Sequence, residues 1–264
     1  MTRHRQRARA VSPRYESTIG KAKATSTDTA PTKVRRLRPI DALRGIAIML
    51  MIVYHFCFDL RFYRVTQADF EHDPFWLGFR ALIVTSFMLL VGISLVLADR
   101  ARLSREHFWK RIALISGCAL AASVASYLIF PRTFIYFGIL HCIAVASVLA
   151  WPVTQRPRLA AAIGVVILVA GLTLAHPVFD QRALSWLGFT TAKPATEDFV
   201  PLAPWAGVVF VGIALGHALI RANFRPVAFL DATPEWIRWL GRHSLVVYMV
   251  HQPILLALLW VAVR

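Results

Sequence analysis

Seven stretches of mainly apolar residues, most of them close to twenty residues long, are the feature that most constrains the fold of this chain. Crossing the hydrocarbon core of a bilayer takes about 20 apolar residues in a helix. The sequence therefore predicts an all-α fold, a polytopic transmembrane helix bundle of about seven spans. The spans are expected at roughly 40–60, 75–98, 111–130, 134–152, 159–175, 203–220 and 243–262.

The composition fits a membrane protein and argues against a nucleic-acid-binding one. Hydrophobic residues make up 57% of the chain and charged residues only 17%, although the net charge is +16. Much of the basic charge lies in the first 39 residues and in short connections, and no zinc-like or RNA-binding motif accompanies it. The three cysteines all lie in apolar runs, where they pack as small hydrophobes. We therefore expect no nucleic-acid partner and no metal.

The distribution of Lys and Arg predicts the orientation and the domain organisation. Residues 1–37 are basic and lack apolar periodicity, which predicts a disordered tail, and residues 38–264 form the transmembrane domain. The tail and every second connection carry 22 of the 30 basic residues, and the opposite connections carry six. Basic residues mark the cytoplasmic side. The N-terminus is therefore expected in the cytoplasm and the C-terminus outside.

The first apolar run carries ionisable residues at both of its ends. Asp41 and Arg44 are three residues apart and His55 and Asp59 four apart, so each pair shares a helix face. The two pairs are roughly 20 Å apart along a helix, which is most of a bilayer core. Asp41 with Arg44 also fits a structural ion pair at the interface. His55 with Asp59 is costly to bury and points to function.

The last apolar run carries a polar stripe. Ser244, Tyr248 and His251 follow one another at spacings of four and three, on one helix face. Such a stripe fits a binding site, and it equally fits interhelical hydrogen bonding. Both interpretations stay open from the residues alone.

Five motifs lie in order along the chain: Arg38-Pro-Ile-Asp-Ala-Leu-Arg-Gly-Ile-Ala-Ile48, Phe87-Met-Leu-Leu-Val-Gly-Ile-Ser94, Phe137-Gly-Ile-Leu140, Asp198-Phe-Val-Pro-Leu-Ala-Pro-Trp205, and Leu240-Gly-Arg-His-Ser-Leu245 with Tyr248 and His251-Gln-Pro253. Together, over about residues 36–255, they resemble the catalytic domain of heparan-alpha-glucosaminide N-acetyltransferase and its bacterial relatives, a branch of a broader group of transmembrane acyltransferases. The resemblance implies transfer of an acetyl group from cytosolic acetyl-CoA across the membrane to a glucosamine amine.

The resemblance also assigns expected roles. The family's functional histidine lies in the first external loop, and His72 in Glu71-His72-Asp73-Pro74 matches it here. The family carries an Asn at the position of His55, and a His with Asp59 behind it could also move a proton. We expect His72, His55 and Asp59 to be catalytic.

The donor is expected to lie along the first and last spans, with its phosphates among cytoplasmic arginines. The expected donor-binding residues are Asp41, Arg44, Arg242, Ser244, Tyr248 and His251. The expected partners are the lipid bilayer, acetyl-CoA and an amino-sugar or glycan acceptor, and a homodimer is compatible with the sequence. The expected location is a bacterial inner membrane. A transporter for a polar solute and a non-catalytic membrane protein of the same fold are the alternatives.

Overall fold

The computed structural model describes residues 37–263, and all of the predicted disordered tail except Leu37 lies outside them. Within these described residues, five helices are long and apolar enough to cross a membrane: α1 (Arg38–Phe62), α2 (Pro74–Arg100), α3 (Arg105–Ile129), α7 (Leu202–Arg221) and α9 (Ser244–Ala262). Two shorter apolar helices, α4 (Ile139–Ala150) and α5 (Pro157–Thr173), occupy two further predicted spans. The predicted all-α bundle is confirmed, and its orientation in the membrane stays a prediction.

Local sequence signals set several of the helix ends. Proline occupies the first turn of α1, α2 and α5, where its missing N–H leaves no helical hydrogen bond unmade. Asp73 precedes α2 and accepts a hydrogen bond from the main-chain N–H of Phe75 at 2.8 Å. Ser104 precedes α3 and accepts one from the N–H of His107 at 3.2 Å. These caps satisfy main-chain donors that a helix leaves open at its start.

The fourth helix begins at Ile139, five residues after the predicted start at 134. The chain is extended there because Phe137 pairs with Phe199 in an isolated bridge, and the N–H of Val200 donates to the Phe137 carbonyl at 3.3 Å. Asp198 then caps α4, accepting from the N–H of Ile139 at 3.0 Å. This pairing depends on a segment sixty residues away, so the local sequence does not signal it.

Short helices fill two connections that the sequence predicted as loops. The connection after α5 contains η2 (Pro177–Asp180) and α6 (Arg182–Ser185). The connection after α7 contains η3 (Arg225–Ala232) and α8 (Glu235–Arg242). The short η1 (Trp151–Val153) ends the fourth apolar segment.

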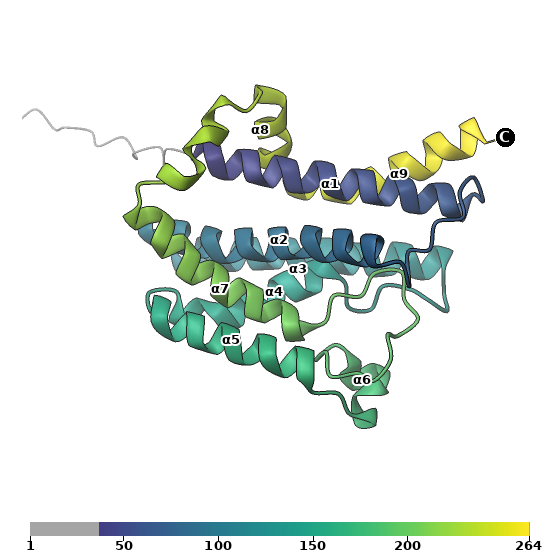
Figure 1. Cartoon of the computed structure of the whole chain (residues 1–264), viewed down its shortest axis with the longest axis horizontal. Coiled ribbons are helices and arrows are strands. Elements are labelled where there is room, and N and C mark those ends of the chain that lie inside the picture. The colour runs from purple at the N-terminus through teal and green to yellow at the C-terminus, as the bar shows by residue number, and fades with distance from the viewer. Residues whose placement is uncertain (1–36, 264) are drawn as a thin grey trace, which may run out of the picture. The chain divides into compact units, whose positions relative to one another are not determined.

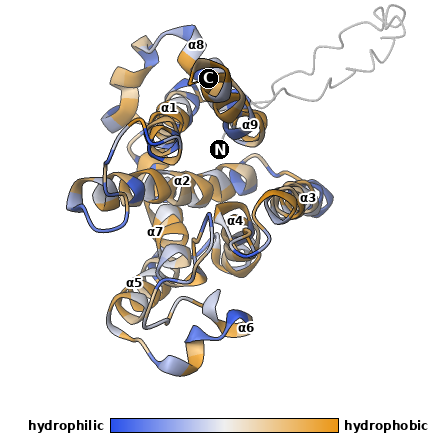
Figure 2. Ribbon diagram, turned by 90° about the vertical axis from the view of Figure 1, so that its right-hand side faces the viewer, coloured by the Kyte–Doolittle hydropathy of each residue, from blue (hydrophilic) through white to orange (hydrophobic). Residues whose placement is uncertain are grey.

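The helices pack in two groups on either side of α2. In Figures 1 and 2, α1 runs along α2 and carries α8 and α9, while α7, α5 and α4 lie on the other side of α2. The main core lies between α2, α4 and α7 and includes the fully buried Met88, Val209 and Ile213. Helix α8 packs close against α1 at Gly241, where a Cβ would collide with the Asp41 carbonyl oxygen. The missing side chain of Gly241 therefore permits this close approach.

Candidate active site

A cluster of polar side chains lies between α1 and α9, inside helices that are apolar enough to span a membrane. Asp59 on α1 is 2% exposed, and its Oδ1 accepts a hydrogen bond from Gln252 Nε2 on α9 at 2.7 Å. The ring of His251 on α9 lies 5.0 Å from that of His55 on α1, edge to face. Two residues from each helix therefore meet at one point of the seam.

Three buried atoms of this cluster find no hydrogen-bond partner among residues 37–263: Asp59 Oδ2, His251 Nε2 and Gln252 Oε1. Buried polar groups are almost always satisfied, because desolvation without a partner costs about 1–3 kcal/mol for each group. Three in one cluster is the kind of exception that marks a functional site. The cluster is therefore the candidate active site.

The hydrogen bond of His251 fixes the role of its ring nitrogens. Nδ1 lies 2.6 Å from the main-chain carbonyl oxygen of Tyr248, which can only accept. Nδ1 must then carry the proton, and in the neutral ring Nε2 is left with a lone pair and no partner. A neutral imidazole with a bare, buried nitrogen is suited to accept a proton.

The predicted pairing of His55 with Asp59 takes a different form. Among the described residues no hydrogen bond joins the two side chains, and the Asp59 carboxyl is held by Gln252 instead. His55 contacts the rings of His251 and Tyr54. Gln252 was not among the predicted site residues, although it lies inside the His251-Gln-Pro253 motif, which was the available signal.

The third predicted catalytic residue, His72, lies apart from this cluster. Its side chain is 83% exposed in the loop before α2, and its Nδ1 lies 3.0 Å from Asp69 Oδ2. Asp69 also accepts hydrogen bonds from the main-chain N–H groups of Glu71 and His72, and these bonds hold the pKa of its carboxyl below the ordinary value. In the described part of the chain, no hydrogen bond or ring contact joins His72 to the α1–α9 cluster.

A second polar group lies at the opposite end of α1. Arg44 Nη1 is 3.4 Å from Asp41 Oδ1, and Arg44 Nη2 donates to Ser94 Oγ of α2 at 2.8 Å. Arg111 on α3 is close enough for its charge to interact with that of Arg44. Within residues 37–263 the Arg111 guanidinium forms no ion pair or hydrogen bond. Arg44 and Arg111 bring two positive charges close together at this end of α1, a combination that favours binding of an anion.

The other predicted donor-binding residues divide between the two ends. Arg242 ends α8 and forms an ion pair with Glu235, with Arg242 Nη2 2.6 Å from Glu235 Oε1. The hydrogen bonds from Arg238 and from Arg242 hold the pKa of the Glu235 carboxyl below its ordinary value. Ser244 begins α9 and is half-buried. Tyr248 packs against the core and lies 5.6 Å from the His251 ring.

Helices with this length and apolarity define a polytopic integral membrane protein. The first of these helices carries ionisable clusters at both ends, which makes the α1–α9 cluster a candidate site inside the bundle. The family model described as "Heparan-alpha-glucosaminide N-acetyltransferase, catalytic" matches residues 36–253. The chain belongs to that family, as its motifs predicted, and the membership implies a membrane acetyltransferase-like function. No curated protein and no solved structure matches the chain.

Proposed function

We propose that this protein is an integral membrane acetyltransferase of the bacterial inner membrane. It moves an acetyl group from cytosolic acetyl-CoA to the amine of an amino sugar, or of a related cell-envelope glycan, on the external face. Membership of an N-acetyltransferase family supports the reaction class. The observation that carries the site is the bare, buried Nε2 of His251 beside His55 and Asp59.

The reaction needs a base, because an amine at neutral pH is mostly protonated and a protonated amine is not a nucleophile. His251 Nε2, or His55 beside it, takes a proton from the acceptor. The freed nitrogen attacks the thioester carbonyl carbon, the C–N bond forms and the C–S bond breaks. As the tetrahedral intermediate collapses, the nitrogen loses a second proton, which leaves on the CoA thiol, and the proton held by the histidine is released to water. The Gln252–Asp59 hydrogen bond holds the two helices in register around the reacting atoms.

The opposite end of α1 suits the donor's phosphates. Arg44 and Arg111 supply two guanidinium groups, and Ser94 orients the first of them. Arg44 and His55 are eleven residues apart, which is ~16 Å along a helix. The donor can therefore bind along the α1–α9 seam, with its phosphates at Arg44 and its thioester near His55, passing Tyr248.

Release of CoA from acetyl-CoA by the purified protein, with amino-sugar acceptors, tests the proposal. We expect His251→Ala and His55→Ala each to lose on the order of 100-fold or more in kcat, as removal of a general base does. His243→Ala is a matched control, because its exposed ring contacts only Trp239 of α8, by a hydrogen bond to the carbonyl oxygen and by ring packing, among the contacts of the described residues. Full turnover in both His251→Ala and His55→Ala would refute the assignment.

The same assay separates the two predicted bases. The family resemblance assigns the role to His72, whereas the geometry favours the α1–α9 cluster, since the His72 side chain faces solvent. We expect His72→Ala to retain at least about a tenth of the wild-type kcat, well above the loss for a general base. Loss in His72→Ala together with full activity in His251→Ala would return the role to the external loop.

The unpartnered buried carboxyl oxygen of Asp59 also favours a second candidate, a proton-coupled transporter, because ionisable groups inside spans mark proton relays. Reconstitution in vesicles distinguishes the two. Acetyl-CoA-dependent modification of an enclosed amino sugar supports the acetyltransferase. Proton-driven uptake of solute without acetyl-CoA supports the transporter.

A further inference from the structure

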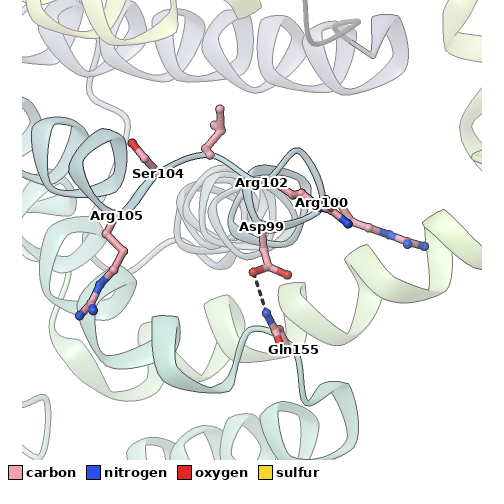
Figure 3. Close-up of a pocket in the computed structure, with 7 residues that line it drawn as sticks. Asp99, Arg100, Arg102, Ser104, Arg105 and Gln155 are labelled. Carbon is pink, nitrogen blue, oxygen red and sulfur yellow. Dashed lines mark hydrogen bonds between the residues drawn. The ribbon is translucent and has the colours of Figure 1, made fainter. Parts of the chain in front are cut away.

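A hollow of about 610 Å³ lies at the end of the bundle away from His55, where α2 passes into α3. Figure 3 shows the residues that line it, and Asp99 in their middle is bonded by Gln155 Nε2 at 3.0 Å. Three of the seven lining residues are arginines, and Asp99 is the one acid. The hollow therefore carries a local excess of positive charge.

The three arginines, Arg100, Arg102 and Arg105, are not committed to protein carboxylates. Within residues 37–263 none of their guanidinium groups takes part in an ion pair or a hydrogen bond, although that of Arg105 lies over the Trp151 ring. In Figure 3 the Arg100 and Arg105 side chains spread to opposite sides of Asp99. Guanidinium groups spread around a hollow fit an anion with several oxygens better than a single atomic ion.

Aromatic rings gather at this end of the bundle, a pattern that is typical of the depth of lipid headgroups. The Arg105 guanidinium lies 5.3 Å from the ring centre of Trp151, and the Phe108 ring stacks on the same indole at 4.7 Å. Trp109, on the next position of α3, is about half exposed. Tryptophans gather at the membrane–water interface, where one side of the ring is apolar and the other is wet.

We infer that this hollow is a binding site for a phosphate group, presented in the membrane by the headgroup of an anionic phospholipid in the leaflet at this end of the bundle. Arg102 and Arg105 contact the phosphate oxygens, and Trp151 holds Arg105 in place. The inference does not depend on acetyl transfer, because its residues lie outside the α1–α9 cluster and its test measures binding. A soluble phosphate is the other source of the same chemistry.

The test is a titration of the full-length purified protein by native mass spectrometry, with dioleoyl-phosphatidylglycerol, dioleoyl-phosphatidylcholine and inorganic pyrophosphate as separate probes. The variant is Arg102→Asn with Arg105→Gln. Arg102 has φ +52°, and Asn tolerates this left-handed conformation, so the change removes charge without backbone strain. Arg221→Gln with Arg225→Gln is the matched control, because it removes the same charge at exposed positions outside the hollow.

Diffuse attraction to an anionic surface gives about 1 kcal/mol for each arginine, so it predicts an equal loss, on the order of 30-fold, for both double variants. A built site predicts that the hollow variant loses at least about tenfold more than the control for phosphatidylglycerol, with phosphatidylcholine unchanged. The same excess loss for pyrophosphate alone supports the phosphate site with a soluble source. Equal losses in the two variants for every probe overturn the inference. Arg105→Glu alone, checked by thermal melting without lipid, repeats the test should the double variant fold poorly.

Discussion

Removing the Asp59–Gln252 hydrogen bond has a quantitative expected effect that distinguishes a catalytic site from a purely structural contact between helices. In Gln252→Leu the carboxyl of Asp59, 2% exposed, loses its one hydrogen bond among the described residues. A hydrogen bond to a charged group contributes about 1.5–3 kcal/mol in soluble proteins, whereas interhelical bonds in a membrane average about 0.6 kcal/mol and reach about 1.7. We therefore expect Gln252→Leu to lower the free energy of unfolding by about 1–2 kcal/mol.

The double variant Asp59→Leu with Gln252→Leu should recover most of that loss, because it leaves neither partner buried and unpaired. Acetyl transfer should stay lost in the double variant, since the site needs the carboxyl and the seam only needs packing. Unfolding in bicelles followed by steric trapping measures the stability, and CoA release measures the activity.

Tyr63→Phe is the matched control on the same seam. Its hydroxyl donates to the Leu256 carbonyl oxygen at 3.2 Å, so the variant removes a hydrogen bond between the residue that follows α1 and helix α9 without changing Asp59. We expect at most about 0.6 kcal/mol of destabilisation and near-normal turnover. A double variant that recovered both stability and activity would refute the assignment of the cluster as an active site, because the polar side chains would then serve only to hold the two helices together.

Three further predictions follow from contacts elsewhere in the bundle. Gly241→Ala should destabilise by about 1–3 kcal/mol in unfolding titrations because its Cβ meets the α1 main chain, whereas Gly117→Ala, with open space around it, should be neutral or stabilising. Burial raises the pKa of the Asp198 carboxyl in the folded protein above its value of about 3.9 in the unfolded chain. The protonated carboxyl therefore contributes fully to stability below pH ~3.9, and this contribution is lost as the pH rises through the folded-state pKa. Melting curves between pH 4 and 7 should show this fall in the wild type and not in Asp198→Asn, whose side-chain oxygen can still accept from Ile139. Arg111→Ala should raise the KM for acetyl-CoA roughly tenfold or more through loss of a charge-assisted contact, measured by CoA release, and an unchanged KM would remove Arg111 from the donor site.

The long helices could be predicted because a span needs about 20 apolar residues in series, a property of the chain itself. Helix α8 could not be predicted, because a helix of eight residues is too short to be stable alone and depends on packing against α1. The late start of α4 depends in the same way on Phe199, sixty residues away.

The pairing of the helices in the bundle also could not be predicted from the sequence. Helical spacing places His55 and Asp59 on one face, but it does not say whether they bond to each other or to a neighbouring helix. Lipid tails are as apolar as the helices, so packing and hydrogen bonds choose the partners. Asp59 is bonded by a residue 193 positions away.

The geometry of the seam bears directly on the interpretation that the sequence left open. If the polar residues of the last span served only to join helices, their hydrogen-bonding atoms would be satisfied by the partner helix, since an unpaired buried atom weakens the contact it is meant to strengthen. The opposite arrangement is found. Gln252 and Asp59 satisfy one atom each, while Asp59 Oδ2, Gln252 Oε1 and His251 Nε2 have no partner among residues 37–263. The cluster joins the two helices through one hydrogen bond and leaves three of the six polar side-chain atoms of Asp59, Gln252 and His251 without a partner in that range, an arrangement that favours a ligand site over a purely structural contact.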